Sequence, residues 1–443
     1  MWIHFLERMK KNKVDIITLG CSKNLVDSEL LMKQFVENGY TVSHDPDEPE
    51  GDIVVINTCG FINDAKEESI NLILDFAKAR KQNKIKKLFV MGCLSQRYLN
   101  DLEQEIPEVD RFYGKFNWKS LIKDLGKSYY SEFSNERILT TPPHYAYVKI
   151  AEGCNRTCSY CSIPIITGKY RSESMEKICD EVSKMVKGGV KEFQFIAQDL
   201  TYYGQDLYKK QNLSELIERV SDIPGVEWVR LHYAYPARFP MDLLRVMRER
   251  ENVCSYLDIA LQHSSDKMLQ IMRRNITKEE TIDLIKKIRE EVPGIHLRTT
   301  MMVGHPGETE EDFADMLDFV GQMRFERLGA FPYSDEEGTY TNLHYEDTIP
   351  AEEKQRRMDE LMSVQETIAM EMNGEKVGKR FKVIIDREEA DFYIGRTEYD
   401  SPEVDTEVLI EKDRSLVTGN FYETFITGSL SFDLTGIVQH KAI

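Results

Sequence analysis

Short apolar runs alternate with helical patterns through the first third of the chain. Three runs rich in valine and isoleucine indicate buried strands: VDIITLG, DIVVINT and KKLFVMG. Apolar residues at helical spacing follow each run, over residues 25–38, 62–80 and 98–106. Because strands that alternate with helices pair in parallel, residues 1–135 are predicted to form a Rossmann-like domain.

A second alternation begins after the proline-containing linker LTTPPHY. Strand-like runs separated by helical segments recur from Tyr145 onward: YAYVKIAEG, EFQFIAQD, EWVRLHYAYP, SYLDIALQH, HLRTTMMVG and RLGAFPYS. This order predicts a parallel α/β barrel within residues 140–372. A last helix is expected over residues 350–372, and Asn373-Gly374 would end it.

Residues 373–443 show a different pattern. Apolar and polar positions alternate in four short runs, RFKVIID, DFYIGRTEY, TEVLIEK and FYETFITGSL. A period of two indicates half-buried strands. Short strands of this kind predict a small antiparallel β-barrel, so the fold class is α/β with a third, all-β domain.

Composition and charge restrict the function classes. The 443 residues carry a formal net charge of −18, so the surface as a whole repels a phosphate backbone. This net charge does not exclude a local basic patch. No apolar run approaches the roughly 20 residues that cross a bilayer. The first residues, interrupted by Glu7, Arg8 and Lys10, do not resemble a signal peptide, and Met9 offers an alternative start. We expect a cytoplasmic protein without a membrane partner, in which clustered cysteines indicate metal or redox ligands.

Three distant cysteines share one topological position. Cys21, Cys59 and Cys93 each follow a predicted strand. Because ligands bind where the carboxyl ends of parallel strands meet, the three thiols should converge. Three thiolates with one open coordination position suit an iron–sulfur cluster with a free iron. One such cysteine would more simply be a buried thiol, but three in the same position favour the ligand hypothesis.

Three further cysteines, Cys154, Cys158 and Cys161, form the compact motif CNRTCSYC. A structural zinc site needs four protein ligands, and no Cys or His follows Cys161 at a suitable short spacing. Three thiolates instead leave one iron of a 4Fe–4S cluster free to chelate a small molecule through an amine and a carboxylate. Cys179 adjoins an apolar helical stripe and Cys254 precedes a strand-like run, so both are expected to be ordinary core thiols.

The CxxxCxxC motif resembles the signature of radical S-adenosylmethionine (SAM) enzymes. Six further blocks, spread over nearly the whole chain, resemble the radical SAM methylthiotransferase family: GCSKNLVDSE, NTCGFINDAKEES, GCLSQRY, IAQDLTYYG, LQHSSDKMLQIMRR and VGHPGETEEDF. The resemblance implies a partial TIM-type barrel in the centre and a TRAM domain at the end. It also implies SAM and two 4Fe–4S clusters as cofactors, one cluster for each set of three cysteines.

The resemblance further implies the reaction. An electron from an external donor cleaves SAM at the cluster of the CxxxCxxC motif and yields a 5′-deoxyadenosyl radical. A second SAM provides the methyl group. The cluster of Cys21, Cys59 and Cys93 carries the transferred sulfur, which an external donor supplies. Tyr160 is expected against the adenine, and we expect Gln198, Gln262 and Arg298 to bind the cofactor from the ends of the barrel strands. Beyond the six cysteines, no catalytic residue is assigned.

Two branches of this family differ in substrate. One modifies an adenosine beside the tRNA anticodon, where its members usually carry QMN, QSG and RPGT. The other modifies the β-carbon of an aspartate in small-subunit ribosomal protein S-twelve, and residues 22–24 (SKN), 262–264 (QHS) and 336–339 (EEGT) resemble this branch.

The charge of the last domain bears on the same choice. Residues 375–443 contain fourteen Asp or Glu and nine Lys or Arg, an excess that suits a basic protein better than RNA, although it could also be only a solvated face. We expect ribosomal protein S-twelve as the partner and no direct nucleic acid binding by the TRAM domain. The tRNA substrate is the main alternative. A zinc-binding scaffold would lack its fourth ligand, and a radical enzyme for a small molecule would leave the first three cysteines and the β tail without a role.

Overall fold

The computed structural model describes residues 12–438, so the alternative start at Met9 lies outside the described residues. The first domain is built on a five-stranded sheet of order β2-β1-β3-β4-β5, in which all neighbours are parallel. This sheet confirms the predicted parallel α/β domain. Its strands are β1 (Lys13–Thr18), β2 (Thr41–His44), β3 (Ile53–Thr58), β4 (Lys87–Gly92) and β5 (Arg111–Phe112).

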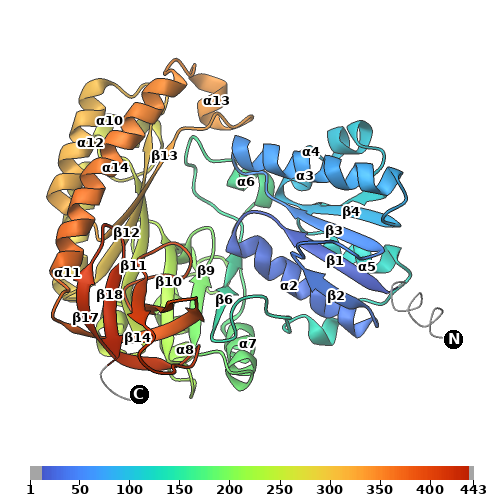
Figure 1. Ribbon diagram of the computed structural model, residues 1–443. Helices are drawn as coiled ribbons and strands as arrows, with labels where there is room; N and C mark the ends of the chain where they lie inside the picture. The colour runs from blue at the N-terminus through green and yellow to red at the C-terminus, as the bar shows by residue number, and fades with distance from the viewer. Residues whose placement is uncertain (1–11, 439–443) are drawn as a thin grey trace.

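Helices cover both faces of this sheet (Figure 1). Helices α2 (Ser22–Glu37) and α5 (Trp118–Asp124) pack on one face, and α3 (Asn63–Lys81) and α4 (Cys93–Glu105) pack on the other. Because both faces are covered, strand β3 is buried throughout and its sequence is an almost continuous apolar run. Helix α4 begins earlier than predicted and is kinked at Tyr98, whose backbone is not helical.

The second domain is a six-stranded parallel sheet that does not close, which confirms the predicted partial barrel. Its order is β13-β12-β11-β10-β9-β6. The largest hydrophobic core of the protein lies between this sheet and its helices. The strands are β6 (Tyr145–Lys149), β9 (Glu192–Ile196), β10 (Trp228–Ala234), β11 (Val253–Gln262), β12 (His296–Val303) and β13 (Arg327–Pro332).

Some of the helices around this sheet begin where the sequence supplies a side-chain cap. Helices α11 and α12 each start at a capping box, in which a threonine and an acidic side chain satisfy the free backbone N–H groups of the first turn. None of the described helices is long and apolar enough to span a bilayer. The segments are η1 (Ser131–Phe133), β7 (Ala151–Glu152), α6 (Ile163–Thr167), β8 (Arg171–Ser172), α7 (Met175–Lys187), η2 (Leu200–Tyr202), α8 (Leu213–Ser221), α9 (Asp242–Glu249), α10 (Asp266–Ile271), α11 (Lys278–Glu291), α12 (Glu310–Met323), α13 (Tyr340–His344) and α14 (Ala351–Gly374).

The third domain is a closed β-barrel of order β14-β15-β16-β18-β17. The prediction of an antiparallel barrel needs one correction, because β16 and β18 pair in parallel. A closed ring with an odd number of strands cannot alternate direction throughout, so one parallel pair is unavoidable. The short strand β18 was not predicted. The strands are β14 (Arg380–Glu388), β15 (Phe392–Thr397), β16 (Val408–Glu411), β17 (Phe421–Ser429) and β18 (Leu434–Val438).

This barrel packs against the amino-terminal ends of the central strands (Figure 1). Buried carboxylates join the two domains, so part of the acidic excess in the tail is neutralised inside the protein. The charge of the tail therefore overstates the acidity that the third domain presents to a partner. The buried pairs between the domains are Arg396 with Glu192, Arg327 with Asp400 and Arg298 with Asp405.

Candidate active site

The structure brings the two sets of three cysteines to one cavity of about 330 Å³ between the first and second domains. In the first domain, one cysteine directly precedes α2, one follows β3, and one opens α4. The second set lies in the loop that follows β7. The loops at the carboxyl ends of the two parallel sheets therefore face each other, as the strand pattern predicted. The first triad is Cys21, Cys59 and Cys93, and the second is Cys154, Cys158 and Cys161.

Glycines allow the first triad to converge. Gly20 has a φ of +92°, and a Cβ at this position would lie 2.8 Å from Cys59 Cβ. Gly92 has a φ of +107°, and a Cβ there would lie 2.5 Å from the carbonyl oxygen of Thr58. Residues other than glycine rarely adopt such backbone angles, and a side chain at either position would collide with these neighbouring atoms. The Gly20-Cys21 and Gly92-Cys93 pairs thus have a geometric cause.

Cations oppose the effect of burial on the pKa values of the first triad. Burial raises the pKa of Cys93 to about 12 and also raises the pKa of Cys59, while the Lys115 ammonium acts in the opposite direction. Burial also acts to raise the pKa of Cys21, but Lys23, Lys115 and backbone N–H groups outweigh it and the pKa is lowered. The cations therefore favour the thiolate at Cys21, whereas burial still dominates at Cys59 and Cys93.

Burial also dominates the pKa shifts of the second triad. Burial raises the pKa of Cys154 to about 12, and burial together with the neighbouring Cys158 raises the pKa of Cys161. Arg274 donates a hydrogen bond to Cys158 Sγ at 3.2 Å and another to Tyr160 Oη at 3.2 Å. A metal that replaced the thiol protons would relieve the cost of deprotonating these groups.

The donor set fits iron–sulfur clusters. Each triad offers three thiols, and no Asp, Glu or His lines the cavity. Among the described residues, no three potential ligands gather as they would around a single metal ion, whereas thiolates of a cluster bind different irons. Gln198 Oε1 is buried on the cavity wall without a hydrogen-bond partner, and such an acceptor suits a donor on a bound molecule. That each triad ligates a cluster stays a prediction.

Three of the four predicted cofactor residues, Tyr160, Gln198 and Gln262, line the cavity. Gln262 has a φ of +77° beside a register shift in β11, so strained backbone faces the cavity. The structure corrects the prediction for Arg298, which is absent from the cavity wall. Arg298 is the third residue of β12, near the amino end of the strand, and pairs with Asp405 of the third domain at 2.5 Å. The sequence identified its strand but not the end of the sheet that its side chain reaches.

The sequence analysis missed the cations of the cavity, which are Lys23, Lys115, Arg156 and Arg274. Lys115 is 3% exposed and donates hydrogen bonds to Asn24 Oδ1 at 3.2 Å and Asp27 Oδ2 at 3.0 Å. It follows β5 by three residues. The rule that found the cysteines, polar residues just after parallel strands, would also have found this lysine if the two-residue strand had been recognised.

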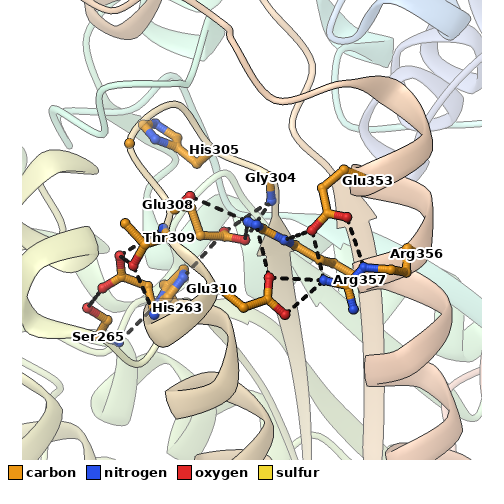
Figure 2. A network of polar contacts seen from close by, with 12 residues as sticks. His263, Ser265, Gly304, His305, Glu308, Thr309, Glu310, Glu353, Arg356 and Arg357 are labelled. Atoms are coloured by element: carbon orange, nitrogen blue, oxygen red, sulfur yellow. Dashed lines mark hydrogen bonds and ion pairs between the residues drawn. The ribbon is translucent and has the colours of Figure 1, made fainter.

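The glycine-rich segment GHPGE braces the site from outside the cavity wall (Figure 2). The backbone N–H of Gly304 donates to Glu308, whose carboxylate also accepts a hydrogen bond from Arg357 of α14 at 2.6 Å. A Cβ at Gly304 would lie 2.3 Å from the Lys354 side chain, which explains the glycine. This network ties the end of β12 to the last helix. The ring of His305 packs edge-on against Tyr160 at 6.3 Å between centroids.

Family models match each domain separately. Residues 13–114 match the uncharacterized protein family UPF0004, and residues 148–320 match the radical SAM superfamily. Residues 377–438 match the TRAM domain. These ranges agree with the order of domains predicted from the strand and helix pattern.

Full-length relatives decide the family. The chain is 67% identical to a protein of Parabacteroides distasonis named ribosomal protein uS12 methylthiotransferase RimO, over 97% of this chain and 100% of that protein. The chain belongs to the RimO family. Proteins of the same name from Bacteroides thetaiotaomicron and Cytophaga hutchinsonii are 65% and 52% identical, over 98% and 96% of this chain and 100% and 98% of their own. The predicted methylthiotransferase family is therefore confirmed, and so are its cofactors, SAM and two 4Fe–4S clusters.

Solved structures support the fold alone. The radical SAM methyltransferase TsrM of Kitasatospora setae, with cobalamin and a [4Fe-4S] cluster bound, superposes on this RimO-family chain with a TM-score of 0.53 at 14% identity. The match covers 75% of this chain and 77% of that one. The two proteins thus share an α/β architecture.

Proposed function

We propose that this protein methylthiolates the β-carbon of an aspartate in ribosomal protein uS12, with SAM as cosubstrate. The observation that carries the proposal is the single cavity lined by cysteine triads from two domains. Inserting sulfur at an unactivated carbon requires a radical source and a sulfur source, and both must reach the same substrate atom. Relatives that share 67% and 65% of the sequence carry the corresponding name, which favours this substrate over tRNA.

The position of each cysteine triad indicates which cluster it would hold. Cys154, Cys158 and Cys161 would hold the cluster that binds SAM, and the first triad would hold the other. Together these bound groups supply radical and sulfur chemistry that acid–base side chains cannot. The chain itself orients and encloses the reactants: Arg274 ties the CxxxCxxC loop to the barrel by donating to Cys158 Sγ and to the carbonyl oxygen of Ala260.

Partners and location follow from the same reaction. It consumes an electron and a sulfur atom, so we propose an external reductant and an external sulfur donor, in the cytoplasm where ribosomes are made. The third domain lies at the end of the central sheet opposite the cysteines, and acids such as Glu389 and Asp391 remain exposed on it. This placement supports a TRAM domain that does not bind nucleic acid directly.

The test compares the two candidate substrates directly. Protein with reconstituted clusters is incubated anaerobically with SAM, sulfide and a reductant, together with either uS12 or an anticodon stem-loop RNA. Mass spectrometry then locates any methylthio group. Modification of an aspartate in uS12 alone is the expected result, whereas modification of the RNA alone would overturn the choice of substrate.

A further inference from the structure

One cation of the cavity has no partner for its charged group within hydrogen-bond or ion-pair distance among the described residues. Lys115 pairs with Asp27 and Arg156 pairs with Asp199, while Arg274 makes the hydrogen bonds already described. Among the described residues, the Lys23 ammonium makes neither a hydrogen bond nor an ion pair, and it lies 3.4 Å from the centroid of the Tyr233 ring. At longer range it acts to lower the pKa of Cys21 and of the buried Asp258. Lys23 is 9% exposed. A buried ammonium is costly unless an anion accompanies it, so this one is suited to an anionic group that enters the cavity.

The local backbone presents this ammonium to the cavity. Lys23 lies in the first turn of α2, two residues after Cys21. Tyr233, beneath the ammonium, has a φ of +63°, and the pairing of β10 with β11 shifts register at this point. A tyrosine rarely adopts such an angle, and strain of this kind is retained where surrounding contacts enforce it, often at ligand sites. The backbone N–H of Tyr233 donates to Asp258 Oδ2 at 3.3 Å, which holds the strained residue in place.

We propose that Lys23 binds the side-chain carboxylate of the aspartate that is methylthiolated, and so determines specificity for that residue. The inference rests on the proposed function, because it assigns a subsite for the proposed substrate. No carboxylate lines the cavity, so an aspartate that enters it meets the Lys23 ammonium without a competing carboxylate of the protein. An adenosine offers no such carboxylate.

The position of Lys23 also orients the reacting carbon. The β-carbon of aspartate is bonded directly to the carboxylate carbon. An ammonium next to Cys21 would therefore hold the β-carbon beside the first triad, which is proposed to carry the sulfur. Lys23 also belongs to the SKN segment that resembles the ribosomal-protein branch. Charge recognition and positioning are thus served by one contact.

The experiment measures discrimination between two forms of the substrate. Wild-type protein, Lys23→Met and Lys23→Arg are compared, each with reconstituted clusters and bound SAM. Lys33→Met is the matched control, because Lys33 lies on the same helix but pairs with Glu37 at 2.7 Å outside the cavity. The ligands are uS12 and a uS12 variant with asparagine at the target position, which keeps the shape and removes the charge. Affinity is measured anaerobically by calorimetry, and kcat/KM by mass spectrometry.

Wild-type protein is expected to bind the aspartate form roughly 10- to 100-fold more tightly than the asparagine form, the range for a hydrogen bond between charged groups. Lys23→Met should lose most of this preference, while Lys23→Arg should retain much of it and Lys33→Met all of it. Iron content and the electron paramagnetic resonance signals of the two clusters serve as structural readouts.

Three outcomes would overturn the proposal. Undiminished discrimination by Lys23→Met would exclude a contact with the carboxylate. Loss of iron or an altered signal from the first-triad cluster in that variant would assign the cation to the cluster, and a matching loss of SAM affinity would assign it to the SAM carboxylate. If wild-type protein left uS12 unmodified, the proposed function itself would fail, which is a separate and recognisable result.

Discussion

Replacing Glu336 by glutamine is expected to loosen the contact between the first and second domains. Glu336 lies in the loop after β13 and is 2% exposed. One of its oxygens accepts hydrogen bonds from Lys66 of α3 at 2.9 Å and from Arg97 of α4 at 2.7 Å. Ser334 donates to the other oxygen at 2.9 Å. A single buried carboxylate therefore holds two cations of the first domain against the second.

The magnitude follows from what the substitution leaves behind. The side chain of Arg97 is only 4% exposed, and that of Lys66 is 14% exposed. Removing one member of a buried ion pair costs about 3–5 kcal/mol, because the remaining charge stays buried without compensation. Glutamine keeps an acceptor oxygen, and Arg97 also donates to the carbonyl oxygen of Glu337. We therefore expect Glu336→Gln to lower the free energy of unfolding by about 3 kcal/mol, at the lower end of this range.

Hydrogen exchange followed by mass spectrometry measures the effect locally. Amides of residues 333–339 and of the first turn of α3 should exchange faster in Glu336→Gln than in wild-type protein. The control is Glu337→Gln, because the neighbouring Glu337 is exposed and its carboxylate accepts only one long hydrogen bond, from Tyr98 at 3.4 Å. Equal exchange rates and equal free energies of unfolding in the two variants would show that the Glu336 carboxylate does not stabilise the contact between the first and second domains.

Three further predictions concern the clusters and stability. Cys93→Ala should lose about half of the bound iron after reconstitution, since one of two four-iron sites is damaged, whereas Cys254→Ala should keep its iron, and iron analysis decides between them. Gly92→Ala should destabilise the first domain by about 1–3 kcal/mol, because its φ of +107° and the 2.5 Å approach to Thr58 exclude a Cβ; denaturant unfolding measures this change. Burial acts to raise the pKa of Asp400, but the Arg327 guanidinium outweighs it and lowers the pKa to about 2. Because this pKa lies below the unfolded value, the carboxylate stabilises the folded protein by about 2 kcal/mol above about pH 4, and this stabilisation is lost as the pH falls toward 2. Unfolding of Asp400→Asn should therefore depend less on pH in that interval than unfolding of wild-type protein, and an unchanged dependence would contradict the assignment.

The sequence alone determined the chemistry-bearing core of the protein. Parallel strands place whatever follows them at one edge, so Cys21, Cys59 and Cys93 could be grouped without knowing any distance. The motif of Cys154, Cys158 and Cys161 is compact enough to be recognised locally. The domain order followed from the change of period along the chain, since helices and strands differ in the spacing of their apolar positions.

Only the tertiary structure decided which charges meet. Arg298 and Asp405 are 107 residues apart in sequence, and their pairing depends on how the barrel packs against the central sheet. The same packing hides acids of the tail that the sequence counted as surface charge. Lys23 stands in a recognisable segment, yet that its ammonium has no ion-pair partner in the described part of the chain emerges only when the neighbouring segments are in place. Local periodicity is a property of adjacent residues, whereas burial and ion pairing depend on distant segments, and for this reason the cysteines could be predicted and the ion pairs of the cavity's cations could not.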